Sequence, residues 1–194
     1  MTVAALGRLA LDTLMTPRDV ATRILSLGLS REAVLTVFAL AVVLNGIMSG
    51  LVLVATDTAT LPIALGPWLV TVVFAAILGT TIWALGWIGR GFGGGASTLQ
   101  IALLVSWVQI LRAFAQLAIL VAGAVFGSAA TVLAVAVIIA GAWVLAHFVD
   151  VAHGFGDPWK AAMVLIMAFV VTAFALIAVM ASFDITPQTV ANHV

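Results

Sequence analysis

The chain has 194 residues, of which 65% are hydrophobic, and its mean hydropathy is +1.34. Charged residues make up 7% of the chain, far below the roughly one quarter found in a soluble domain, so a water-soluble fold is excluded. Seven basic and seven acidic residues give a net charge of zero, which excludes a basic nucleic-acid-binding surface. The absence of cysteine excludes disulfides, thiol nucleophiles and thiolate metal sites.

Charged residues interrupt the apolar sequence of residues 1–32, and this pattern predicts a cytoplasmic segment that is retained in the mature protein. Arg8 and Asp12 break any continuous apolar stretch of the kind that a cleavable signal peptide needs. The sequence therefore favours an N-terminus that stays in the mature protein.

Thr16-Pro17-Arg18-Asp19 predicts the start of a helix within this segment, which Gly28 ends. We expect Thr16 as the N-cap, Pro17 at the first helical position and Asp19 as a capping-box partner. Apolar residues at helical spacing lie opposite the arginines, which predicts an amphipathic interfacial helix along the cytoplasmic leaflet. A helix docked on the cytoplasmic end of the bundle is the alternative. The apolar residues are Val20, Ile24 and Leu27.

Long apolar runs follow, and the chain has room for about five of them as membrane spans. Turn and breaker residues separate the runs, for example in the segments 89–98 and 150–160. We predict an all-α membrane protein: a five-helix transmembrane bundle in one membrane domain at 33–182, after the interfacial helix, with a short non-cytoplasmic tail at 183–194. The predicted spans cover about residues 33–55, 63–88, 99–126, 129–149 and 161–182.

Lysines and arginines outside the spans all fall on one side of the predicted membrane. Cytoplasmic loops are enriched in these residues, so the N-terminus is expected in the cytoplasm, and an odd number of spans places the C-terminus outside. We expect these side chains at the membrane surface: Arg18, Arg23, Arg31, Arg90 and Lys160.

A polar stripe inside the third run is the first candidate site. Gln109, Arg112 and Gln116 lie within about 60° of one another on an ideal helix. Arg112 is near mid-bilayer, where an arginine costs about 2.5–3.5 kcal/mol. Arg112, helped by the glutamines and by Asn45 of the first span, is expected to meet an anionic group of a ligand, a lipid or a partner subunit. The alternative is structural: Arg112 bonds carbonyls and polar side chains of the bundle, or snorkels toward an interface.

A second candidate lies at the end of the fourth run. His147, Asp150, His153 and Asp157 would share one side of a helix that continued that far, and imidazole and carboxylate groups can bind a divalent metal or relay protons. Because glycines and Pro158 break the helix there, loop capping by Asp150 is the alternative.

Glycine motifs predict packing rather than nucleotide binding. The segment 89–94 matches GxGxxG, but it follows a membrane helix instead of a strand, and we expect a flexible turn. The pairs Gly46/Gly50 and Gly123/Gly127 have the small-xxx-small spacing that allows close approach of helices, and we expect intramolecular packing more than dimerisation.

The flanking sequences TPRDVATRILSLGLSREA, before the first span, and AHGFGDPWKAAMVLI, into the last, resemble the Yip1 family of five-span membrane proteins in its short bacterial form. The resemblance covers roughly residues 16–182. It implies a cytoplasmic N-terminus, a five-helix bundle and a bacterial inner membrane. Eukaryotic relatives associate with Rab-type GTPases through a longer, Tyr-containing N-terminal region; this chain has no tyrosine, so Rab binding is not carried over.

We therefore expect a non-enzymatic membrane protein without a cofactor, which organises or associates with lipids and other membrane proteins, or with copies of itself. The rival interpretation is a small transporter or channel for an anionic ligand, with Gln109, Arg112 and Gln116 as its polar path.

Overall fold

The computed structural model describes residues 3–55 and 67–182, and the secondary structure of these residues is entirely helical. Two short helices come first, α1 (Val3–Met15) and α2 (Pro17–Ser26). The long helices that follow are long and apolar enough to cross a membrane. The chain is thus an all-helical, multi-pass membrane protein. The long helices are α3 (Arg31–Ala55), α4 (Pro67–Gly91), α5 (Thr98–Phe126), α6 (Ala129–His153) and α7 (Pro158–Ser182).

The ends of the long helices differ from the predicted spans by a few residues, because polar residues continue some helices beyond the apolar runs. Helix α6 stays helical past residue 149 until Gly154, whose φ of 68° is left-handed and whose N–H donates to the Asp150 carbonyl. The predicted second-span start at 63–66, the loop at 56–62 and the tail at 183–194 lie outside the described residues.

A reciprocal cap fixes the start of α5, the helix that carries the polar stripe. The Ser97 N–H donates to Gln100 Oε1 at 2.8 Å, and the Gln100 N–H donates to Ser97 Oγ at 3.2 Å. Because two otherwise unpaired donors are satisfied there, the register of α5, and with it the depth of its polar residues, is fixed from the first turn.

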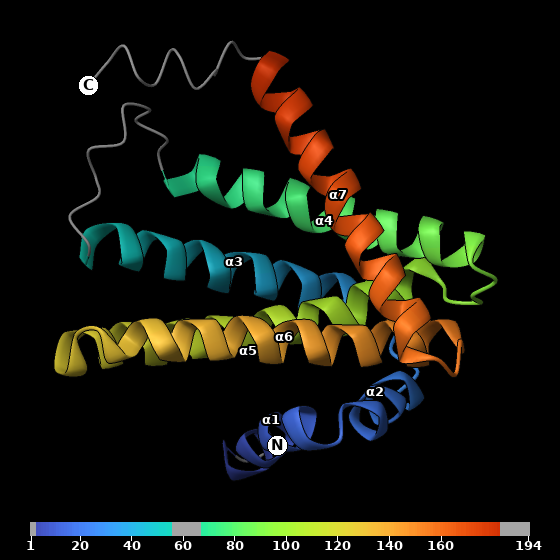
Figure 1. Cartoon of the computed structure of the whole chain (residues 1–194), viewed down its shortest axis with the longest axis horizontal. Helices are drawn as coiled ribbons and strands as arrows, with labels where there is room; N and C mark the ends of the chain where they lie inside the picture. Colours follow the sequence, from blue (N-terminus) through green and yellow to red (C-terminus); the bar gives the residue numbers. More distant parts are fainter. Residues whose placement is uncertain (1–2, 56–66, 183–194) are drawn as a thin grey trace.

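Helix α5 is at the centre of the bundle, with α3 on one side and α6 on the other, while α7 crosses α4 (Figure 1). The start of α3, the end of α4, the start of α5, the end of α6 and the start of α7 meet at one end of the molecule. We call this the basic end, because its exposed side chains include Arg18, Arg23, Arg31, Arg90 and Lys160.

Large apolar side chains cover the outside of the bundle as well as its core. Leu85, Ile101 and Val164 are buried where α4, α5 and α7 meet. Ile138 of α6 and Phe169 of α7 are 70% and 74% exposed, which only an apolar solvent such as lipid makes favourable.

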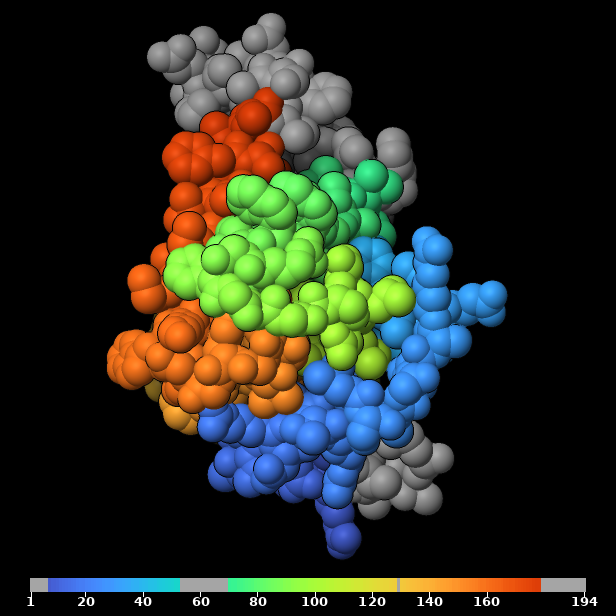
Figure 2. All heavy atoms as spheres, turned by 90° about the vertical axis from the view of Figure 1, so that its right-hand side faces the viewer, coloured from blue at the N-terminus to red at the C-terminus, as the bar shows by residue number. Residues whose placement is uncertain are grey.

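The N-terminal helices are docked on the bundle. Helix α2 was predicted to lie along the cytoplasmic leaflet, with docking on the end of the bundle as the alternative, and the structure shows the docked arrangement. Val20, Ala21 and Ile24 of α2 are buried in a cluster with Leu104 of α5 and Phe148 of α6. Figure 2 shows the blue N-terminal segment against the orange end of α6 and start of α7, at the basic end. Val20 and Ile24 of the predicted apolar face are therefore covered by protein, whereas Leu27, at the end of α2, is 62% exposed.

Helix α2 begins at Pro17 after Thr16, as predicted, but the predicted capping box is wrong. Thr16 makes no side-chain cap, because its hydroxyl donates instead to the Asp12 carbonyl of the preceding helix at 3.2 Å. Asp19 therefore has no capping role.

The preceding helix α1 was absent from the sequence prediction. It is held by Thr13, whose buried hydroxyl accepts a 3.2 Å hydrogen bond from Trp107 Nε1 of α5.

Candidate functional site

Arg112 is the middle residue of the 29-residue helix α5, and its side chain is exposed on the surface of the bundle. Its guanidinium carbon lies 5.8 Å from the centroid of the Phe74 ring of α4. Phe74 was not singled out from the sequence, because nothing in a run of apolar residues marks which ring faces a cation. A desolvated cation–π contact contributes about 2 kcal/mol, less than the roughly 2.5–3.5 kcal/mol that an arginine costs at this depth.

No acidic side chain of the described residues pairs with Arg112, whose guanidinium also has no hydrogen-bond partner there. The acidic residues of the long helices are Glu32 and Asp150, and both lie at the basic end. At 1.5 Å per residue, the middle of α5 is about 21 Å from either end of that helix, well beyond the length of an arginine side chain. Arg112 thus presents a positive charge at the middle of α5 with no ion-pair partner among the described residues.

Asn45 of α3 does not join Arg112; it ties α3 to α5. Its Nδ2 donates to the Ala41 carbonyl at 2.8 Å and to the Gln109 carbonyl at 3.0 Å, and the residue is 1% exposed. Ser106, one turn before Gln109, is fully buried beside this junction. Within the described part of the chain, Asn45 Oδ1, Gln109 Oε1 and Ser106 Oγ have no hydrogen-bond partner.

The predicted stripe therefore divides into two parts. The backbone of Gln109 serves the α3–α5 junction, whereas the Arg112 side chain is exposed and Gln116 is partly buried. Ser106 was missed from the sequence, although its spacing of three from Gln109 would have placed it near the same face.

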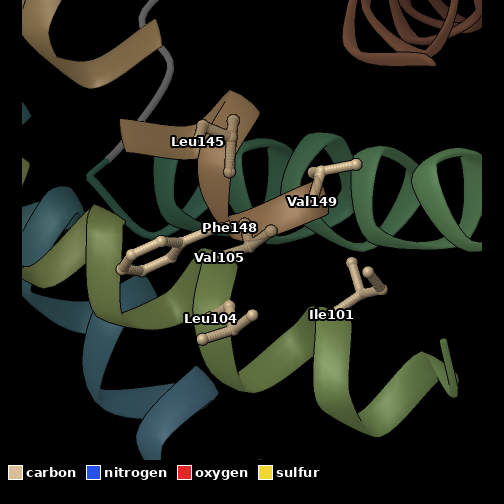
Figure 3. A pocket seen from close by; sticks show the side chains of 6 residues that line it. All are labelled: Ile101, Leu104, Val105, Leu145, Phe148 and Val149. Atoms are coloured by element: carbon tan, nitrogen blue, oxygen red, sulfur yellow. The ribbon is translucent and has the colours of Figure 1, made fainter. Parts of the chain in front are cut away.

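An apolar pocket lies between α5 and α6 near the basic end, away from Arg112 (Figure 3). It is too narrow to admit a water molecule, and all of its lining side chains are apolar. This pocket offers no polar path to the stripe. The lining residues are Ile101, Leu104, Val105, Leu145, Phe148 and Val149.

The four residues of the second candidate do not converge. No group of three or more His, Asp or Glu side chains placed to hold a metal is found in residues 3–55 and 67–182. Asp150, 2% exposed, forms an ion pair with Arg18 of α2 and accepts the Asp157 N–H at 3.0 Å. Asp157 Oδ1 accepts the Trp159 N–H at 2.9 Å. The carboxylates thus cap the α6–α7 turn and anchor α2, as the alternative predicted for Asp150.

The two histidines are separated by other contacts. His147 Nδ1 lies 2.9 Å from the Trp143 carbonyl, one turn earlier on α6. The ring of His153 is buried against Gly89 of α4 and Gly94 of the α4–α5 connection, and a Cβ at either glycine would overlap the ring. The Gly95 N–H donates to the His153 carbonyl at 3.1 Å. The glycine-rich segment predicted as a flexible turn therefore serves to accommodate His153.

The predicted intramolecular use of the small-residue pairs is seen at one member of each. A Cβ at Gly46 would overlap the Thr71 hydroxyl of α4, and Gly123 faces Ala130 of α6. Gly50 faces open space, and Gly127, with φ of 56°, follows the end of α5.

The chain matches no family model, no curated protein and no solved structure. The resemblance to the Yip1 family accordingly stays a prediction from the flanking sequences.

Proposed function

We propose that this protein is a membrane scaffold without enzymatic activity or cofactor, which associates within the bilayer with another membrane component through Arg112. The proposal rests on one observation: the exposed guanidinium at the middle of α5 has no anionic partner among the described residues. A charge at that depth is retained in membrane proteins when it serves a function or meets a partner. An external anionic group would complete the interaction.

We place the protein in the inner membrane of a bacterium as a Yip1-like protein, with its N-terminus in the cytoplasm and its C-terminus outside. The gathering of Arg18, Arg23, Arg31, Arg90 and Lys160 at one end supports this orientation, because cytoplasmic loops carry most lysines and arginines. These exposed cations would also lie at the level of anionic lipid headgroups.

A small transporter for anions is the second candidate, because Arg112 is exposed and the partly buried Gln116 lies one turn away on the same face of α5. Two observations favour the scaffold over it. Asn45 is occupied by hydrogen bonds that join α3 to α5, and the pocket beside α5 is apolar and too narrow for water. A path for a hydrated anion would need a polar, wet cavity.

Photo-cross-linking in native membranes tests the scaffold. A photoreactive amino acid at Gln116, one turn from Arg112, is expected to give an adduct with another membrane component, and Arg112→Leu should reduce its yield about tenfold, the loss of one strong interhelical contact. The matched control, Arg90→Leu at the basic end, should leave the adduct unchanged.

Flux measurements complete the test. Liposomes that contain the purified protein should take up small anions no faster than empty liposomes. Uptake that depends on Arg112, together with an absent or Arg112-independent adduct, would establish the transporter and overturn the scaffold.

A further inference from the structure

Arg112 projects from a strip of α5 that the rest of the bundle covers only in part. On an ideal helix, the residues within about 60° of Arg112 include positions one and two turns away. Val105, two turns before Arg112, is buried between α5 and α6, whereas the neighbours of Arg112 on this strip, from Val108 to Ile119, are partly buried and Arg112 itself is exposed. We call the part of this strip from Val108 to Ile119, on which Arg112 is exposed, the Arg112 shelf. It consists of Val108, Gln109, Arg112, Ala115, Gln116 and Ile119.

The chemistry of the shelf suits one carboxylate. A guanidinium binds a carboxylate through two parallel hydrogen bonds, a geometry that ammonium or amide groups do not reproduce. Gln116 adds an amide one turn away, and Ala115 is small enough to let a second helix backbone approach. The remaining side chains of the shelf are apolar apart from Gln109.

The depth of Arg112 selects the source of that carboxylate. The middle of α5 is about 21 Å from its ends, whereas lipid phosphates lie at the boundary of an apolar core about 30 Å thick. A phosphate would reach Arg112 only if the bilayer thinned around it, at a cost in free energy. A transmembrane helix brings an acidic side chain to mid-depth without that deformation.

A second copy of this chain cannot supply the group from its described helices. The acidic residues of the long helices are Glu32 and Asp150, at the basic end, and Asp150 already pairs with Arg18. Asp12 and Asp19 lie in α1 and α2, which are too short to span a membrane. Asp57 and Asp184 lie outside the described residues. Self-association would therefore bring Arg112 of one copy no mid-depth carboxylate from the helices of another.

We propose that the Arg112 shelf docks a transmembrane helix of a different protein, one that carries an Asp or Glu near the middle of its span. This inference rests on the proposed scaffold function and names the partner of the same site.

The test uses the full chain in phosphatidylcholine vesicles and a labelled synthetic peptide with a leucine-rich span and a single central Glu. Energy transfer should show that this peptide binds about tenfold more tightly than the same peptide with a central Gln, a difference typical of one strong interhelical contact. Arg112→Gln should remove that preference, so that the Glu and Gln peptides bind about equally. Arg90→Gln, the matched substitution at the basic end, should preserve it.

Two results with phosphatidylcholine vesicles would overturn the inference. One is equal binding of the Glu and Gln peptides to the unmodified protein. The other is energy transfer between two labelled copies of the chain that Arg112→Gln abolishes, which would make a second copy the occupant.

A lipid occupant is separated by the choice of vesicle. If phosphatidylglycerol vesicles remove the Glu preference, an anionic lipid occupies the shelf and the inference fails. The scaffold function would then still stand on an Arg112-dependent adduct in native membranes, whereas the loss of that adduct would remove both.

Discussion

Arg18 and Arg112 differ in whether a carboxylate pairs with them. Arg18, with 48% of its side chain exposed, pairs with the buried carboxylate of Asp150 and anchors α2 to α6. Arg112 has an aromatic ring beside it and no carboxylate within the described helices. The comparison indicates that Arg18 maintains the fold through its ion pair, whereas Arg112, at the middle of α5, has no such partner among the described residues.

The largest effect is expected from Arg18→Leu, which leaves Asp150 buried without its counterion. Removal of one partner from a buried pair costs about 3–5 kcal/mol; because Arg18 is half exposed, we expect about 2–3 kcal/mol of lost unfolding free energy in detergent. Adding Asp150→Asn should recover most of the loss, since the amide oxygen still accepts the Asp157 N–H. A double variant as unstable as Arg18→Leu alone would show that charge burial is not the cause.

Gly94→Ala should follow, because the new Cβ overlaps the His153 ring. Overpacking of this kind costs about 1–3 kcal/mol of unfolding free energy. Gly95→Ala is the matched control, since nothing lies within 4 Å of a Cβ there. Thermal unfolding in detergent compares the two. Equal stability of both variants would mean that the glycine does not hold the ring.

A smaller effect is expected from Thr13→Val, which keeps the shape of the side chain and removes the hydroxyl bonded to Trp107. The same hydroxyl donates to the Leu9 carbonyl at 2.7 Å, so two hydrogen bonds of α1 are lost. We expect a loss of about 1–2 kcal/mol in all, which should loosen α1 rather than the spans. Faster amide hydrogen exchange confined to residues 3–15 would confirm this. Uniformly faster exchange along the chain would contradict it.

Hydropathy and local spacing predicted much of this structure. A helix in lipid must pair its own backbone groups and expose apolar side chains, so long apolar runs in the sequence identify the spans. The start of α2 at Pro17 was also predictable, because proline is favoured at the first position of a helix. The Arg18–Asp150 pair was not, since 132 residues separate its members and only the docking of α2 brings them together. The histidine between two glycines also depends on tertiary contact.

For the candidate site, helical spacing placed Gln109, Arg112 and Gln116 near one face but could not show how their roles differ. The Asn45 side chain was expected beside Arg112, and instead it is bonded to the backbone of Gln109. Spacing alone cannot tell whether an amide faces a cation or a neighbouring carbonyl, because that depends on how two helices pack. Helix α1 was missed because Arg8 and Asp12 interrupt its apolar pattern.

The central claim is that Arg112 is not part of what holds the bundle together. The unfolding free energy of Arg112→Leu, measured in detergent beside that of Arg18→Leu, tests it most directly. We predict that Arg112→Leu stays within about 0.5 kcal/mol of the unmodified protein or exceeds it, while Arg18→Leu falls. A loss for Arg112→Leu as large as that for Arg18→Leu would contradict the claim.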